Sequence, residues 1–327
     1  MSTRPFDPDS HQLSPLHGSD RVWVETNCYV DIWIELIHHL GLPPQPAGLC
    51  ALSGDWIGRE WSFLKYQTDD LRRLYGIDVA EINLWRPVEE HVLDHLDVGD
   101  LVTVESDAWY LPDTAGVSYQ EAHVKTTIVP VALDVEGRTM TYLHNAGMYT
   151  LSGEDFEGAL ARPGAQSCAP QPYLELVRLH RVNRDLATLP LRARELAQDH
   201  LSRRPADNPV ARLATYVQSA LPDLATRGMS YFHDFSFAVS RQLGLTGQNA
   251  SDGLGWLAEH DATLTAGQRD ELIGAATEFD QVSQIAKKLQ FAVARIAAGR
   301  QRDVRPLLDE LVTHWEAGMG AAGRALP

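Results

Sequence analysis

The sequence predicts an α+β domain followed by an all-helical domain, and three observations support this fold class. Before residue 160, short runs rich in β-branched residues alternate with helical patterns, whereas the chain after residue 172 is helical in pattern almost throughout. Between them, ARPGAQSCAPQP (161–172) has three prolines and no hydrophobic period, which is typical of a linker. The length, 327 residues, also favours two domains. We therefore expect a flexible segment over 1–20, an α+β domain over 21–160, a linker over 161–172 and a helical domain over 173–327.

The first expected helix starts at Cys28 and runs through YVDIWIELIHHL. Its apolar side chains recur at the spacing of an amphipathic helix, namely Tyr29, Ile32, Trp33, Leu36, Ile37 and Leu40. Thr26 and Asn27 are both good N-caps, and Gly41 is a good C-cap. This helix is the strongest local prediction in the first half of the chain.

The strands expected in the same domain lie further along the chain. LVTVE (101–105) is a short β-rich run. HVKTTIVPVAL (123–133) and TMTYLH (139–144) are joined by the turn sequence DVEGR, which predicts a hairpin. After the linker, helices are expected over 172–186, 190–203, 209–221, 229–243, 268–298 and 304–318, and no repeat of 20–50 residues is visible.

Composition narrows the class of protein. Hydrophobic residues make up 44% of the chain, as in ordinary globular proteins, yet no run of about 18 apolar residues occurs. The N-terminus is polar and proline-rich and lacks the pattern of a signal peptide. The three cysteines, Cys28, Cys50 and Cys168, cannot all pair and form no CxxC motif. We expect a cytoplasmic protein without a membrane partner or a disulfide framework.

Charge is distributed unevenly along the chain. Residues 1–160 hold 9 Lys and Arg against 26 Asp and Glu, whereas residues 161–327 hold 19 against 18. The acidic first half argues against nonspecific nucleic-acid binding, so DNA is not an expected partner. Basic residues cluster over 178–204 and 287–305. These clusters are either solvated helix faces or a docking site for a phosphate-bearing or acidic partner.

Cys28 is the candidate nucleophile, because the start of a helix stabilises a thiolate. An inert core cysteine is the alternative. His123 opens the first hairpin strand and is the candidate base, with His144 as an alternative. Asn145 ends the second strand and is expected near His123, where it would fix the imidazole tautomer. Asp134 and Asp107 are alternative partners of the imidazole. The order Cys, strand-borne His, Asn is that of papain-like enzymes.

Motifs for other kinds of active site give weaker evidence than the Cys28 site does. His91 and His95 lie one helical turn apart but lack the glutamate of a zincin. The sequence contains no P-loop, no GxGxxG after a strand and no GxSxG. Neither a metal ion nor another cofactor is therefore predicted.

Several segments resemble a known family. They are NCYVDIWIELIHHLGL (27–42), DLRRLYGIDVAEINLWRP (70–87), ESDAWYLPDTAGVSY (105–119), HVKTTI (123–128) and YLHNAGMYTLSGEDF (142–156). Together they are similar to the bacterial domain-of-unknown-function family 1839 over most of residues 20–160. More distantly, the layout resembles acyltransferases of the butirosin-biosynthesis protein H type. Those enzymes have a papain-like (cysteine-protease-like) N-terminal domain and a helical tail, and they move an acyl group from a carrier-protein thioester to an amine.

This resemblance implies roles for several residues. Cys28 matches the nucleophile, His123 the base, and Asn145 the position that usually holds Asp. Papain-like enzymes often place an oxyanion-hole Gln six residues before the cysteine, where this chain has Val22. The helix start, with Thr26, Asn27 and the Cys28 N–H, is then the expected oxyanion site.

The expected function is thus an acyl- or aminoacyltransferase with a cysteine nucleophile. Its donor would be a phosphopantetheinylated acyl carrier protein or an aminoacyl-tRNA, and its acceptor a small amine. The alternatives are a cysteine hydrolase (peptidase or amidase) and a non-catalytic binding protein on the same fold. The loop WYLPDTAG (109–116) is expected to cover the cleft. Asp107, Tyr110, Asp113 and Tyr119 are the candidate substrate-binding residues.

Overall fold

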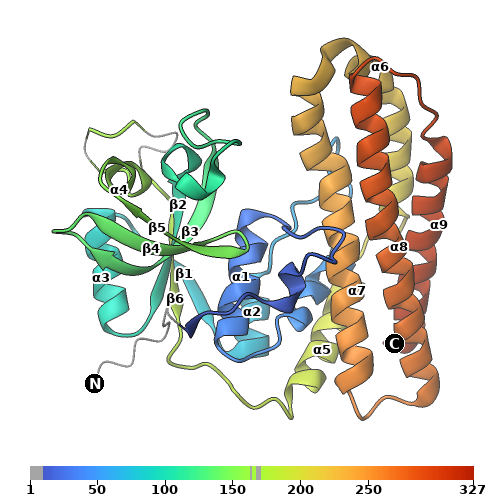
Figure 1. The fold of residues 1–327 in the computed structure, drawn as a ribbon. Coiled ribbons are helices and arrows are strands. Elements are labelled where there is room, and N and C mark those ends of the chain that lie inside the picture. Colours follow the sequence, from blue (N-terminus) through green and yellow to red (C-terminus); the bar gives the residue numbers. More distant parts are fainter. Residues whose placement is uncertain (1–9, 163, 167–170) are drawn as a thin grey trace. The chain divides into compact units, whose positions relative to one another are not determined.

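The computed structural model describes residues 10–162, 164–166 and 171–327 and divides the chain into two compact units (Figure 1). The first unit comprises residues 1–44 and 67–184, and the second comprises 45–66 and 185–327. The α+β class with a helical C-terminal region is confirmed. The boundary lies later than the expected 161–172 linker, and residues 163 and 167–170 of that segment lie outside the described residues.

The first unit is built around a six-stranded sheet in the order β1-β6-β2-β3-β4-β5, and all neighbouring strands are antiparallel. The strands are β1 (Asp78–Glu81), β2 (Leu101–Asp107), β3 (Lys125–Asp134), β4 (Thr139–His144), β5 (Gly147–Ser152) and β6 (Leu174–Arg178). The predicted hairpin is confirmed as β3 and β4.

The helix expected over 172–186 is wrong, because this segment contains β6. Leu174, Glu175, Leu176 and Val177 are all buried, as in an inner strand whose two faces are both covered. The strand pairs with β1 on one side and β2 on the other. Pairing on both edges outweighs the weak local preference of five residues, and it brings the segment into the first unit.

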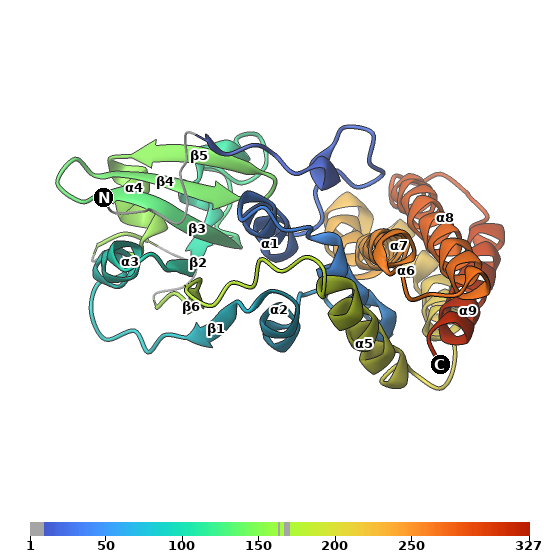
Figure 2. The same cartoon turned by 90° about the horizontal axis from the view of Figure 1, so that it is seen from below.

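Helices cover both faces of this sheet (Figures 1 and 2). The helices α3 (Val88–Asp97) and α4 (Glu154–Ala159) pack on one face. That side holds an apolar core that includes Val92, Val104, Ile128, Tyr142 and Phe156. On the other side, α1 (Cys28–His39) packs on β3 and β4, and α2 (Thr68–Tyr75) packs on β1.

The helix α1 is buried on its polar side as well as on its apolar side, since Asp31 and Glu35 are fully buried. The segment that precedes it supplies their partners and contains a 3-10 turn, Pro15–His17. Ser14 and His17 are buried. The expectation of a flexible segment over 1–20 is therefore wrong for residues 10–20, while residues 1–9 lie outside the described residues.

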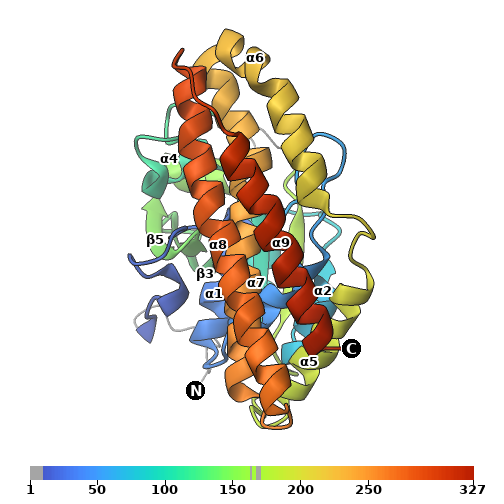
Figure 3. The same ribbon diagram turned by 90° about the vertical axis from the view of Figure 1, so that its right-hand side faces the viewer.

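The second unit is helical (Figure 3). Its helices are α5 (Leu189–Ser202), α6 (Pro209–Ser236), α7 (Gln242–His260), α8 (Ala266–Ala297) and α9 (Arg305–Ala325). A kink divides α6 at Gly228, whose φ of +73° favours glycine. This is where the sequence pattern separates a helix over 209–221 from one over 229–243.

Residues 45–66 also belong to the helical unit, although the sequence analysis assigned them to the α+β domain. They begin with the 3-10 turn Gln45–Ser53, which is buried almost throughout. Trp61 Nε1 donates to Thr246 Oγ1 of α7 at 2.9 Å, and the Trp61 ring packs edge-on against Trp315 of α9. Burial of the tryptophan between two helices explains the assignment.

Among the residues that the structure describes, every helix is too short or too polar to cross a membrane.

Candidate active site

Cys28 is the first residue of α1, as the sequence predicts, and its side chain is half-buried. Asn27 is the N-cap, and its Oδ1 accepts hydrogen bonds from the N–H groups of Tyr29 and Val30. The Cys28 sulfur lies 3.9 Å from Thr127 Oγ1 on β3. The thiol therefore faces the side of the sheet to which Thr127 points.

The strand register identifies the other side chains on this face. Asp107 is paired with Lys125, and Glu105 with Thr127. Directly paired residues and residues two apart point to the same face of a sheet. Glu105, Asp107, Lys125 and Thr127 therefore lie on the side of Cys28. We call Cys28 together with these four residues the Cys28 face.

His123, which lies beyond the strand ends, also belongs to the Cys28 face. Ala108 N donates to the carbonyl of Val124, which continues the pairing of β2 with β3. Trp109 and His123 then lie opposite each other, and their rings stack with centroids 4.5 Å apart. His123 Nδ1 lies 2.7 Å from Oδ2 of Asp107, whose side chain is fully buried. A carboxylate that accepts Nδ1–H leaves Nε2 as the free base.

The imidazole partner is thus Asp107, one of the alternatives that the sequence left open, and not Asn145. Val129 pairs with Leu143, so Asn145 is level with Thr127 and four residues away from His123. Asn145 has a positive φ of 47° in the turn between β4 and β5. The expected proximity failed because β4 ends at His144 and the chain turns back into β5 before it reaches the level of His123.

Cys28 and His123 occupy opposite ends of the Cys28 face. Thr127 and His123 are four positions apart, which corresponds to roughly 13 Å along an extended chain. Within the described residues, the hydrogen-bond partner of the thiol is Thr127 rather than the imidazole. The structure therefore brings the predicted nucleophile and base to one face without direct contact.

An ion pair that the sequence analysis missed lies between them. Lys125 Nζ is 2.9 Å from Glu105 Oε1, and about half of the lysine side chain is exposed. Nearby on the same side, buried Glu175 accepts from the Tyr29 hydroxyl at 3.1 Å. With Asp107, this gives three carboxylates against one lysine, so the surroundings favour a cationic group over an anion.

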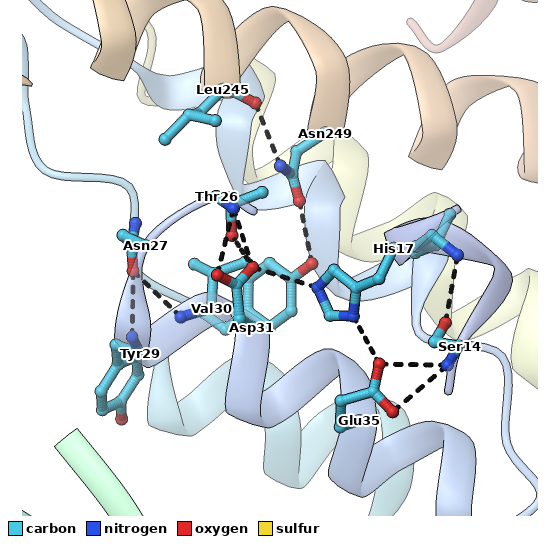
Figure 4. A network of polar contacts seen from close by, with 12 residues as sticks. Ser14, His17, Thr26, Asn27, Tyr29, Val30, Asp31, Glu35, Leu245 and Asn249 are labelled. Atoms are coloured by element: carbon cyan, nitrogen blue, oxygen red, sulfur yellow. Dashed lines mark hydrogen bonds and ion pairs between the residues drawn. The ribbon is translucent and has the colours of Figure 1, made fainter. Parts of the chain in front are cut away.

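A buried ionic cluster contacts α1 on the side of Asp31 and Glu35 (Figure 4). His17 Nε2 lies 3.1 Å from Asp31 Oδ1, and His17 Nδ1 contacts Glu35 Oε1. His11 Nε2 lies 3.1 Å from the other oxygen of Glu35, and Ser14 N also donates to that carboxylate. Both ring nitrogens of His17 face carboxylate oxygens, so both donate and the ring is an imidazolium.

Burial works against charge in this cluster, but the partners outweigh it. Burial disfavours the imidazolium, yet hydrogen bonds and charges from Asp31 and Glu35 raise the pKa of His17 to about 9. Burial likewise disfavours the Glu35 carboxylate, yet His11, His17 and the Ser14 N–H lower its pKa to about 2. His17 and Glu35 are therefore both charged at neutral pH.

The cluster also fixes the chain that enters α1. Asp31 accepts the N–H of Thr26 at 2.9 Å and its hydroxyl as well. The Thr26 hydroxyl and the Asn27 Oδ1 are thus committed to anchoring and capping. Of the oxyanion donors expected from the sequence, the Thr26 hydroxyl donates to Asp31, and the Asn27 amide caps the helix through its oxygen.

The other predicted substrate-binding residues lie elsewhere. The Tyr110 hydroxyl donates to the Gln166 carbonyl, and the Tyr119 hydroxyl donates to Asp155. The side chain of Asp113 is buried and contacts Tyr142 and His144. These contacts anchor the loop after β2 within the first unit.

His144, the alternative base, lies on the opposite face from Cys28. Its Nε2 is 2.7 Å from Thr126 Oγ1. Since Thr126 and Thr127 are consecutive in β3, their side chains point to opposite faces. His144 therefore cannot serve the Cys28 thiol.

A sequence signal for the missed cluster does exist. Asp31 and Glu35 are four residues apart on a helix whose other residues are mostly apolar, so they share one face. Two carboxylates on a helix buried all round require a cation. Histidines precede the helix at positions 11 and 17.

Comparison with known proteins identifies the family. Residues 12–179 match the model of the DUF1839 N-terminal domain, and residues 187–323 match that of the DUF1839 C-terminal domain. A comparison with curated proteins finds no match. The chain belongs to the DUF1839 family.

Proposed function

We propose that this member of the DUF1839 family is a cysteine-dependent acyl- or aminoacyltransferase, with Cys28 as nucleophile. The observation that supports this most is the combination of a half-buried cysteine at a capped helix start with a His123–Asp107 pair on the same sheet face. The proposal includes the papain-like fold and the distant likeness to acyltransferases of the butirosin-biosynthesis protein H type.

In the first step, the Cys28 thiolate attacks the carbonyl carbon of a thioester donor. The new bond joins Cys28 Sγ to the acyl carbon, the donor carbon–sulfur bond breaks, and the donor thiolate takes up the proton that Cys28 released. The donor is a phosphopantetheinylated carrier protein, and an aminoacyl-tRNA would pass its acyl group from an ester oxygen in the same way.

In the second step, an amine attacks the acyl-cysteine. The nitrogen–carbon bond forms and the Sγ–carbon bond breaks. Of the two protons that a protonated amine loses, His123 takes one and releases it to water, and the other returns to the Cys28 sulfur. Asp107 holds the tautomer that makes Nε2 basic. Lys125 and His123 are the more exposed members of the Cys28 face, which favours entry of the acceptor from their end. The excess of carboxylates around the Cys28 face would attract a protonated amine.

The separation of His123 from Cys28 favours a role for the imidazole on the acceptor rather than on the thiol. A protonated amine must lose a proton before it attacks, and the His123 imidazole lies at the exposed end of this face, where it can accept that proton. Contacts between catalytic groups also commonly tighten only when substrate is bound.

The test is product formation from acyl-pantetheine and a panel of small amines, with free acid measured in parallel. Amide product that requires Cys28 supports the transferase. Release of free acid alone, at a rate that amines do not change, would make the protein a cysteine hydrolase instead. Turnover that persists in Cys28→Ala would reject both.

A further inference from the structure

A second candidate site lies in the helical unit. A pocket of about 740 Å³ is lined by α6 and by the connection between α8 and α9. Figure 3 shows this end of the unit, where the bend of α6 and that connection lie. The volume is in the range of pockets that bind small molecules.

One wall of the pocket is apolar. It comprises Leu221, Pro222 and Ala225 of α6 with Ile296 of α8 and Val304 before α9. Ile296 and Val304 are buried, so this wall is part of the packed core of the helical unit. An alkyl chain placed against this wall would leave water.

The rim of the pocket is basic. Gly299, two residues after the end of α8, has a φ of +80°, and the chain that follows supplies Arg300, Arg302 and Arg305 to the lining. The acid among them, Asp303, is engaged with Arg305, since its Oδ1 lies 3.0 Å from the Arg305 N and 3.1 Å from its Nε.

Arg300 and Arg302 differ from Arg305. Both side chains are exposed, and in the described part of the chain neither forms an ion pair with a carboxylate. Two guanidinium groups beside an apolar wall therefore provide uncompensated positive charge and ten N–H donors for an oxyanion.

We propose that this pocket binds an amphipathic anion, with an alkyl or acyl chain on the α6 wall and a phosphate or carboxylate head group between Arg300 and Arg302. The site lies wholly within the helical unit and shares no residue with the Cys28 face. It therefore goes beyond the proposed transferase activity and does not depend on it.

Calorimetric titration of the full chain with butyl, hexyl and octyl phosphate, and with octanoate, tests the proposal. Affinity is expected to rise by about threefold to fourfold for each methylene that the pocket buries. Inorganic phosphate should bind much more weakly than octyl phosphate. Whether octyl phosphate or octanoate binds more tightly then identifies the preferred head group.

Three variants locate the binding. Arg300→Ala and Arg302→Ala should each weaken octyl phosphate binding by about tenfold. Ala225→Phe fills the pocket from an exposed position and should abolish the dependence on chain length. Arg295→Ala is the matched control, because it removes the same charge from an exposed position outside the lining.

Absence of binding by both octyl phosphate and octanoate would overturn the proposal. So would affinities that the two arginine variants leave unchanged, or that Arg295→Ala lowers equally. A chain-length dependence that survives Ala225→Phe would also reject this pocket as the site. Cys28→Ala should bind octyl phosphate like the wild type, whatever its activity.

Discussion

Cys28 Sγ lies 3.9 Å from Thr127 Oγ1, and this contact joins residues 99 positions apart in the sequence. It determines which face of the sheet the thiol shares. Because Thr127 alternates with Thr126 along β3, the contact groups Cys28 with Lys125, Glu105 and the His123–Asp107 pair rather than with His144.

Cys28 should be more reactive than Cys50. Cys28 is half-buried at a helix start, whereas Cys50 is buried in the helical unit. With iodoacetamide at pH 7 under native conditions, Cys28 is expected to react at least ~10-fold faster, measured by mass spectrometry of peptides. Equal rates at the two sites would mean that Cys28 has no special environment.

His17→Gln should destabilise the first unit by about 3–5 kcal/mol, because it removes the cation from two buried carboxylates. Urea unfolding at pH 7 measures the loss. His180→Gln is the control, since His180 is an exposed histidine of the same unit. A loss no larger than that of the control would show that the cluster contributes little.

The stability of the first unit should fall as the pH rises from neutral. The pKa of His17 is raised from 6.5 to about 9, so its contribution is complete below 6.5 and is lost as the pH rises through 9. Glu35 acts in the opposite direction, since its pKa is lowered from 4.5 to about 2 and its contribution is lost only as the pH falls through 2.

Between pH 6.5 and 9.5 the free energy of unfolding is therefore expected to decrease by up to about 3 kcal/mol. Unfolding curves at several pH values measure this slope. His17→Gln should reduce it to that of the remaining groups. An equal slope in His17→Gln and the wild type would assign the pH dependence to other residues.

Asp107→Asn should lower the transfer rate by about 10²–10⁴-fold, because an amide no longer fixes the basic tautomer of His123. Acylation of Cys28 by the thioester donor should persist, so the acyl-enzyme accumulates. Asp134→Asn is the control, since Asp134 is exposed and its Oδ1 accepts the Gly137 N–H. Equal transfer rates for the two variants would show that Asp107 has no role in the mechanism.

Local patterns predicted part of this fold well. The helix that starts at Cys28 and the β3–β4 hairpin follow from apolar spacing, caps and a turn sequence, all of which act over a few residues. β6 was misassigned as helix because its identity depends on pairing with β1 and β2, which are distant in sequence. The same holds for Trp61, whose partners lie on α7 and α9.

The candidate site was predictable to a similar extent. Cys28 was located by the cap before it, and His123 by its place at a strand start. The partner of His123 depends on the strand register: Asp107 is opposite Lys125, whereas Asn145 is level with Thr127. The register of β2 against β3, which a long connection joins, cannot be deduced from residue types alone.

The central claim, that Cys28 is a covalent nucleophile, is tested most directly by intact-mass spectrometry. The wild type and Cys28→Ala are each mixed with acyl- and aminoacyl-pantetheine thioesters in the absence of an amine, and both are also treated with iodoacetamide. We predict that the wild type gains the mass of the acyl group and that Cys28→Ala does not. No acyl adduct, together with alkylation of Cys28 no faster than that of a free thiol, would contradict the account and favour a non-catalytic binding protein.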